Sequence, residues 1–302
     1  PNPALELSDS PFYVNTVTRP WFVTPGAARR AGVSAFGFGG TNFHVVLEEY
    51  AEDFLRDHKA ALRHRWPCEL FVWHAATPEH LTNRLKHFLG LLPSKDSSRM
   101  PLNEAAYRCA HEAAHNEMVQ GPGSRLAIVA DSVSDLKKKL EKAIRELSRG
   151  IQDIEDPQGV YYTQRPLFHA GSLVFLFPGQ GSQYVGMLAE ATITFPEVAE
   201  AFEQADHVLM PYLGRPLSHF VYPPPVFHEQ ERNEQQRALT ETQVAQPALG
   251  AAALGLLRLL RSLKIVPHVA AGHSYGEYVA LCDAGVFSSE ELFEISFKRA
   301  QC

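Results

Sequence analysis

The sequence is poor in cysteine, has no basic tract and contains no long uninterrupted apolar run. Its four cysteines (Cys68, Cys109, Cys282 and Cys302) have neither metal-site nor disulfide-framework spacing, so we expect a reducing, cytoplasmic compartment. The formal net charge of −6 is spread along the chain, which argues against a nucleic-acid partner. No apolar run reaches the roughly 18 residues of a membrane span, and the opening PNPALELSDSPF does not resemble a signal peptide, so we expect no membrane partner.

A serine lies between two glycines in AGHSYGEYVAL, residues 271–281. The preceding VPHVAA has the length of a strand, and the following EYVALCDAGV predicts a helix with Glu277 in its first turn, where an acid suits the helix dipole. Strand, Gly-x-Ser-x-Gly and helix are together typical of a nucleophile elbow, in which backbone N–H groups beside the serine can hold an oxyanion. Ser274 is therefore a candidate nucleophile, although the same five-residue pattern also suits a purely structural turn.

The first of three regions ends at about residue 50 and contains a Gly-rich turn, Gly37 to Gly40, that leads into the strand NFHVVLEEY. The turn is not a dinucleotide fingerprint, because the G-x-G-x-x-G spacing fails and a strand rather than a helix follows. Taken alone, its glycines indicate close backbone packing or a loop that must move.

The second region, residues 51–168, alternates between strand and helix patterns. The predicted strands are CELFVWHA, RLAIVA and GVYYTQ, and the predicted helices are TPEHLTNRLKHFLGLL, LNEAAYRCAHEAAHNEM and SVSDLKKKLEKAIRELSRG. Thr77 and Pro78 suit the cap and first turn of the first helix, and Gly150 suits the end of the third. We predict a small α+β domain of two or three strands and two or three helices.

The stretch HEAAH, residues 111–115, puts two imidazoles on one helix face with a glutamate as a candidate base, which is the pattern of a zinc hydrolase. The extended form of that motif needs a third ligand, and the third position after His115 is Met118. We therefore expect no metal and favour a surface or packing helix, with a zinc hydrolase as the minor alternative.

The third region, from residue 169 to the end, holds two strand–turn–helix units. In the first, LVFLF predicts a buried strand, PGQGSQ a turn rich in backbone N–H groups, and YVGMLAE the start of a helix. The second unit is the elbow, which follows the long apolar helix TQVAQPALGAAALGLLRLLRSL. In open α/β sheets such loops gather at the carboxyl ends of the strands, where ligands bind.

Three motifs, FPGQGSQ, TQVAQPAL and GHSYGE, resemble in their order and separation the acyltransferase domain of polyketide and fatty-acid synthases. SPFYVNTVTRPW and RRAGVSAFGFGGTNFHVVLEEY resemble the end of a thiolase-fold ketosynthase, and details of the motifs look closest to polyunsaturated-fatty-acid and enediyne synthases. The resemblance implies an α/β protein with a thiolase-fold ketosynthase tail at 1–50 and a small α+β linker domain at 51–168. Residues 169–302 would then be part of an α/β-hydrolase-like acyltransferase core with a parallel sheet.

In that family the motif serine takes a malonyl-type group from coenzyme A and passes it to the phosphopantetheine thiol of an acyl carrier protein, without a bound cofactor. The resemblance makes Ser274 the nucleophile and gives the oxyanion hole to the backbone N–H groups of Gln180 and Tyr275. His273 and Gln246 match positions that line the pocket.

Two further assignments follow from the resemblance. Arg299, at the family's usual spacing from the serine, matches the arginine that holds the free carboxylate of the substrate, although Ala300 stands where the family usually has glycine. Phe38 and Asn42 match the gating loop beside the ketosynthase pocket.

The family's catalytic base is a histidine that would lie beyond Cys302, so we expect these 302 residues alone to be inactive. The implied partners are an acyl carrier protein, malonyl-CoA and the remaining domains of a homodimeric synthase, and the choice between malonyl and methylmalonyl stays open. Two alternatives also stay open: a serine esterase or thioesterase with the same elbow, and a non-catalytic structural linker. An esterase leaves GQGSQ and Arg299 without a clear role.

Overall fold

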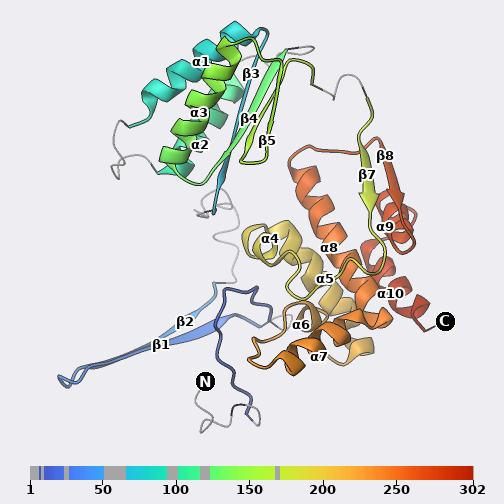
Figure 1. Ribbon diagram of the computed structural model, residues 1–302. Coiled ribbons are helices and arrows are strands. Elements are labelled where there is room, and N and C mark those ends of the chain that lie inside the picture. Colours follow the sequence, from blue (N-terminus) through green and yellow to red (C-terminus); the bar gives the residue numbers. More distant parts are fainter. Residues whose placement is uncertain are drawn as a thin grey trace. The chain divides into compact units, whose positions relative to one another are not determined.

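The computed structural model describes residues 7, 10–23, 27–50, 66–93, 101–115, 123–166 and 171–301. The chain divides into two compact units (Figure 1), one of Pro1–Ala61 with Leu173–Cys302 and the other of Leu62–Ser172. The start of the expected linker, residues 51–65, lies outside the described residues, as do Met118 and Cys302. The boundaries of the three expected domains stay a prediction.

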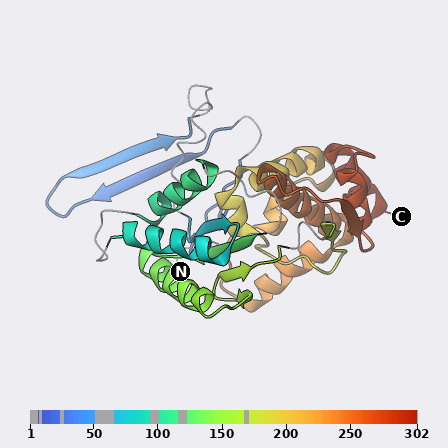
Figure 2. The same cartoon turned by 90° about the horizontal axis from the view of Figure 1, so that it is seen from above.

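An antiparallel hairpin, β1 (Arg30–Phe36) and β2 (Asn42–Glu48), occupies most of the described part of the first region. Its turn is closed by a hydrogen bond from the Gly37 N–H to the Thr41 carbonyl, and Gly40 has a φ of 92°, which favours glycine. Figure 2 shows the hairpin as an extended two-stranded ribbon. Strand β2 confirms the predicted strand, whereas the sequence pattern does not predict β1.

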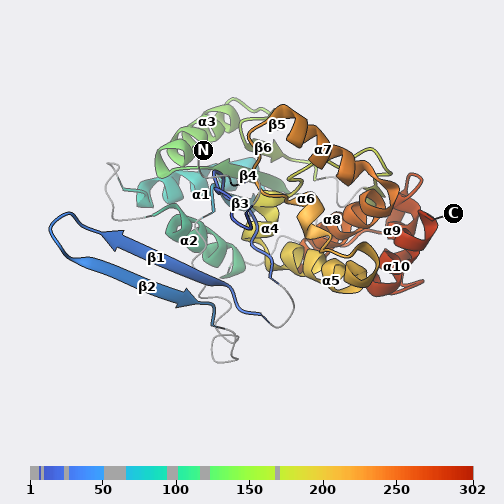
Figure 3. The same ribbon diagram turned by 90° about the horizontal axis from the view of Figure 1, so that it is seen from below.

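The rest of this unit builds a helical layer beside a short parallel pair of strands, β7 (Val174–Phe177) and β8 (Val269–Gly272). Helices α5, α8 and α10 pack against one another (Figure 3), and their apolar side chains form the core. The helices are α4 (Ala189–Thr194), α5 (Pro196–Leu213), α6 (Ser218–Val221), α7 (Glu229–Thr240), α8 (Thr242–Ser262), α9 (Gly276–Asp283) and α10 (Ser289–Arg299).

The predicted helix start at YVGMLAE is wrong, because α4 begins only at Ala189. Gly186 and Leu188 have φ values of 81° and 57°, so the turn at residues 185–188 enters the left-handed region twice and cannot propagate a helix. The helix therefore begins only after Leu188, where the backbone leaves the left-handed region.

Helix α8 confirms the long apolar helix, and its environment explains why it is apolar nearly all round. By length and composition it could cross a membrane, but 67% of its apolar 18-residue window is buried inside the protein. Two glycines allow close neighbours, since a Cβ on Gly250 would lie 2.5 Å from the Tyr275 hydroxyl and one on Gly255 would lie 3.0 Å from Val198 Cα. This pattern is that of a central core helix.

In the second unit, an antiparallel sheet with strand order β3-β4-β6-β5 packs one face against three helices (Figure 1). Alternate side chains such as Phe71, Trp73, Leu126 and Ile128 are buried, as expected for a sheet with one covered face. The elements are β3 (Glu69–Ala75), α1 (Pro78–Leu91), α2 (Leu102–His115), β4 (Ser124–Ala130), α3 (Val133–Ser148), β5 (Asp153–Asp156) and β6 (Val160–Thr163).

The α+β prediction for this unit is confirmed, but the expected two or three strands are too few. Four strands occur in the described part of the unit, and the additional one is β5. Its sequence, DIED, has one apolar residue among three carboxylates, so a sequence pattern gives no sign of burial. It is one of the two edge strands of the sheet, where charged side chains are tolerated.

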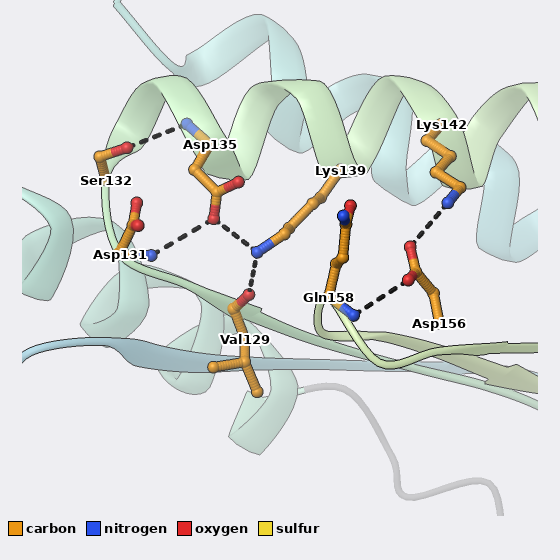
Figure 4. Close-up of polar contacts among 8 residues, drawn as sticks. All are labelled: Val129, Asp131, Ser132, Asp135, Lys139, Lys142, Asp156 and Gln158. Atoms are coloured by element: carbon orange, nitrogen blue, oxygen red, sulfur yellow. Dashed lines mark hydrogen bonds and ion pairs between the residues drawn. The ribbon is translucent and has the colours of Figure 1, made fainter.

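Helix α3 is held to the sheet by a set of polar contacts (Figure 4). Ser132 caps the helix by accepting a hydrogen bond from the Asp135 N–H at 3.1 Å. The Lys139 ammonium donates to the Val129 carbonyl at 2.8 Å and pairs with Asp135 at 2.6 Å.

The predicted cap of α1 is confirmed. The Thr77 side chain accepts a hydrogen bond from the His80 N–H at 3.2 Å.

Candidate functional site

The predicted elbow is confirmed as a strand, a tight turn and a helix. Strand β8 ends at Gly272, α9 begins at Gly276, and Ser274 between them is exposed. Ser274 has a φ of 53°, a left-handed conformation that is uncommon for a residue with a side chain and that accompanies functional sites. The turn is closed by backbone hydrogen bonds, including one from the Glu277 N–H to the Ser274 carbonyl at 3.2 Å.

The glycines of the motif are required by close backbone packing. A Cβ on Gly272 would collide with the backbone of Gly276 and Glu277, and a Cβ on Gly276 would collide with the Phe177 carbonyl. The turn after β7 approaches equally closely, because a Cβ on Gly179 would lie 2.7 Å from the His273 carbonyl. The two loops that follow the parallel strands therefore meet at one edge, as the sequence predicts.

Two backbone donors at this junction are free to bind a ligand. Neither the Gln180 N–H nor the Tyr275 N–H donates to an acceptor within the part of the chain that the structure describes, whereas the adjacent Gly181 N–H donates to Gln183 Oε1 at 2.8 Å. The Ser274 hydroxyl also has no hydrogen-bond partner among these residues. The Tyr275 N–H at the start of α9 and the Gln180 N–H on the facing loop are thus free beside the serine, which suits the binding of an oxyanion.

Gln246 lies next to Gln180, so the structure brings these two predicted residues together. The Gln246 side-chain amide donates to Gln180 Oε1 at 3.2 Å, and the Gln180 amide donates to the Thr242 hydroxyl at 3.3 Å. Gln246 is 5% exposed, and its Oε1 has no partner in the described ranges. The two bonds anchor the side chain of Gln180 to α8 and so restrict the backbone that carries its N–H.

Tyr275 points away from the exposed serine into the core. Its side chain is 1% exposed, and its hydroxyl donates to Ser296 Oγ at 2.7 Å, while Ser296 donates to the Leu292 carbonyl at 2.6 Å. Burial raises the pKa of Tyr275 well above its usual value, so the phenol keeps its proton. No sequence signal singles out Ser296, because the contact joins two elements that only the fold brings together.

Arg299 is the last residue of α10 and has no carboxylate partner among the described residues. Its guanidinium carbon lies 5.1 Å from the ring centre of Tyr278, a residue of α9 to which no sequence motif assigns a role. The neighbouring Lys298 instead pairs with Glu294 at 3.2 Å. Arg299 is half-buried and charged, so it is available to an anionic ligand.

The remaining predicted residues lie elsewhere or on the rim. His273 is exposed beside the serine, and its Nδ1 faces the backbone of Gly179. Phe38 is fully exposed in the hairpin turn and Asn42 begins β2; neither makes a hydrogen bond or ring contact with the elbow among the described residues. Their gating role stays a prediction.

The HEAAH stretch is helical, as predicted, and forms the end of α2. The ring of His111 lies 6.0 Å from that of Tyr107, and the side chain of His115 is outside the described part. Across the described ranges, no three His, Cys, Asp or Glu side chains gather as a metal site would require.

Comparisons with known proteins agree with the elbow and its surroundings. Residues 174–302 match the acyl transferase domain family, and residues 1–116 match the ketoacyl-synthetase C-terminal extension. Residues 174–302 are therefore acyltransferase sequence, and nearly the whole chain is similar to polyketide and polyunsaturated-fatty-acid synthases. The predicted resemblance is therefore confirmed, and neither the esterase nor the zinc-hydrolase alternative is favoured.

The chain is similar to two large synthases and to a solved acyltransferase domain. One chain of the polyunsaturated fatty acid synthase of Thraustochytrium sp. is 29% identical over 98% of this chain and 11% of that protein. Polyketide synthase GfsA of Streptomyces halstedii is 31% identical over 100% of this chain and 4% of that protein. The solved acyl transferase domain of ZmaA has a TM-score of 0.61 and 25% identity, covering 79% of this chain and 49% of that one. The chain thus shares the α/β fold of these acyltransferases and spans only a small part of the relatives' length.

Proposed function

We propose that this acyltransferase forms an acyl-enzyme on Ser274 from a malonyl-type coenzyme A thioester and passes the acyl group to a carrier-protein thiol. The observation that carries the proposal is the exposed Ser274, held at a φ of 53° beside two free N–H groups. In the first half-reaction the serine oxygen attacks the thioester carbonyl and the C–S bond breaks. Coenzyme A leaves as the thiol and takes up the proton that the serine gave to the base. In the second, the phosphopantetheine thiol attacks the serine ester, and Ser274 regains its proton.

The two N–H groups supply the electrostatic part of the mechanism. Both tetrahedral intermediates carry a negative oxygen, and the N–H groups of Gln180 and Tyr275 are the donors that would receive it. Gln246 and Thr242 hydrogen-bond to the side chain of Gln180, and these bonds restrict the backbone N–H of the same residue, so this donor is preorganised. Donors that are fixed in advance stabilise developing charge without reorganising during the reaction.

The malonyl selectivity is assigned to Arg299. A malonyl thioester differs from an acetyl thioester by a carboxylate, and a planar guanidinium can bind it through two parallel hydrogen bonds. Arg299 has no competing carboxylate among the described residues, whereas Lys298 is paired with Glu294. A methylmalonyl thioester carries the same carboxylate, so the assignment holds for either extender unit.

The general base is assigned, from the resemblance to the acyltransferase family, to a histidine outside these 302 residues; in the described part of the chain no histidine side chain hydrogen-bonds to Ser274. General-base assistance typically contributes about 10²–10⁴-fold, so Ser274 without it is a poor nucleophile. We further propose a homodimeric synthase in the cytoplasm, in which residues 1–50 complete a thiolase-type ketosynthase and residues 51–168 form the linker. The acyltransferase core would extend the β7–β8 pair into a larger, hydrolase-like parallel sheet.

The test is acylation of Ser274 in the complete protein. After incubation with malonyl-CoA, mass spectrometry of the peptides should find the malonyl group on Ser274 and lose it in Ser274→Ala. Ser182 is the matched control, since it is an exposed serine on the facing loop that makes no hydrogen bond to the elbow in the described structure. Ser182→Ala should be acylated normally, and labelling that survives Ser274→Ala would contradict the proposal.

A further inference from the structure

Two tyrosines connect the elbow to the helix that carries Arg299. Tyr275 and Tyr278 are one helical turn apart, with the Tyr278 N–H donating to the Tyr275 carbonyl at 3.0 Å. Their rings stack, with centroids 6.2 Å apart and planes inclined by 15°. On α10, Ser296 receives the Tyr275 hydroxyl and Arg299, one turn later, lies over the Tyr278 ring. The two helices are therefore joined by one buried contact and one contact nearer the surface.

We propose that Tyr278 is a positioning residue, whose aromatic face holds the Arg299 guanidinium where it can bind the substrate carboxylate. The proposal rests on the proposed function, because it assigns Tyr278 a role only through Arg299. An arginine side chain has about 2 kcal/mol of rotamer entropy, which it must lose to present a fixed fork. The ring of Tyr278, whose centre lies 5.1 Å from the guanidinium carbon, restricts this side chain.

An aromatic ring suits this task better than a carboxylate would. A neighbouring Asp or Glu would occupy the N–H donors of the guanidinium and compete with the substrate for them. The face of a ring attracts the cation through its quadrupole and accepts none of those donors in a strong hydrogen bond. The N–H donors of the Arg299 guanidinium thus stay available to the substrate carboxylate, while the ring restricts the conformation of the side chain.

The position of the ring is fixed in turn by the core. Tyr275 is buried and bonded to Ser296, and Tyr278 stacks on it. The Tyr278 hydroxyl has no hydrogen-bond partner among the described residues, so the contacts of this side chain with Tyr275 and Arg299 are made by its ring. The proposed role therefore depends on the ring and not on the hydroxyl.

The experiment compares Tyr278→Phe, which keeps the aromatic face, with Tyr278→Leu, which keeps apolar bulk without it. Both are measured in the complete protein with malonyl-CoA and acetyl-CoA. Tyr278→Leu should raise the KM for malonyl-CoA roughly three- to tenfold, with little change in kcat and none in acetyl transfer. Tyr278→Phe should behave as the unaltered protein in both reactions.

A second arm asks whether Tyr278 acts through Arg299. In an Arg299→Ala background, Tyr278→Leu should have no further effect on malonyl transfer, because residues that act as a unit are not additive. A further loss there, equal losses of malonyl and acetyl transfer in Tyr278→Leu, or an equally damaging Tyr278→Phe would each overturn the proposal. If Ser274 of the unaltered protein is not malonylated, the proposed function fails instead.

Discussion

The Tyr275 hydroxyl lies 2.7 Å from Ser296 Oγ, so the residue beside the candidate nucleophile is bonded directly to α10. Ser296 passes the interaction on by donating to the Leu292 carbonyl at 2.6 Å. All three groups are in the core, where water cannot replace a lost partner. The bond therefore fixes the distance between the elbow and the helix that carries Arg299.

Removing the two ends of this bond should have unequal effects. Ser296→Ala leaves the buried Tyr275 hydroxyl without an acceptor and should lower the free energy of unfolding by about 1–3 kcal/mol. Tyr275→Phe leaves Ser296 bonded to Leu292 and should lower it by only about 1 kcal/mol. In the double variant the combined effect should be smaller than the sum of the two, as measured by urea denaturation, and full additivity would show that the bond contributes nothing.

The motif glycines should be intolerant of any side chain. Gly276→Ala places a Cβ against the Phe177 carbonyl, which must then move and disturb the junction of the two loops. We expect malonylation of Ser274 to be lost in the complete protein. Gly90→Ala is the matched control, because this helical glycine has no described atom within 4 Å of its Cβ position and the substitution should stabilise α1 by about 0.5–1 kcal/mol. A Gly276→Ala variant with normal acylation would contradict the close packing.

The parts of the fold that can be predicted from the sequence are those with strong local signals. The elbow has glycines on both sides of the serine and an apolar strand before it, and α1 has Thr77 and Pro78 at its start. Strands β1 and β5 escape prediction because the first is rich in small residues and the second in carboxylates. Neither has the alternation by which a half-buried strand is recognised.

In the candidate site, too, the residues within motifs can be predicted from the sequence, whereas their contacts with other elements cannot. Ser274, Gln180 and Gln246 follow from motifs, and the structure places the two glutamines in contact. Ser296 and Tyr278 could not be predicted, since helical periodicity shows which face of a helix is buried but not which residue it meets. The partners of these residues lie on other elements, and only the packing of α9 on α10 brings them together.

Asp206 should make the stability of the protein depend on pH. Burial raises the pKa of this carboxyl from 3.8 to about 6, although the Ser218 hydroxyl and N–H both donate to it. The folded-state pKa is the higher one, so its stabilising contribution is complete below about pH 4 and is lost as the pH rises through 6. The loss corresponds to about 3 kcal/mol for two pKa units.

Asp206→Asn isolates this contribution, because the amide cannot ionise and can still accept from the Ser218 N–H. Between pH 4 and pH 7 the unfolding free energy of Asp206→Asn should rise relative to the unaltered chain by up to about 3 kcal/mol. Urea denaturation at several pH values measures this difference. A difference that does not change with pH would show that Asp206 has an ordinary pKa in the folded protein.

The last prediction concerns the carboxylate and the residue assigned to hold it. Arg299→Ala removes a charged pair of hydrogen bonds from malonyl binding, a loss of about 2–4 kcal/mol, and should reduce malonyl transfer steeply in the complete protein. Acetyl transfer should stay unchanged or rise, since acetyl has no carboxylate to hold. Arg299→Lys should restore little, because an ammonium is a point charge that cannot reproduce the planar fork.

Lys298 supplies the control for this prediction, as it carries the same charge one residue earlier but is paired with Glu294. Lys298→Ala should leave the ratio of malonyl to acetyl transfer unchanged, because exposed pairs of this kind contribute only about 0.3–0.5 kcal/mol to the helix. A general electrostatic attraction of malonyl-CoA to the end of α10 would instead make the two variants similar. Equal reductions of malonyl and acetyl transfer in Arg299→Ala would give this arginine a structural role, and the carboxylate would then have to be held by another residue.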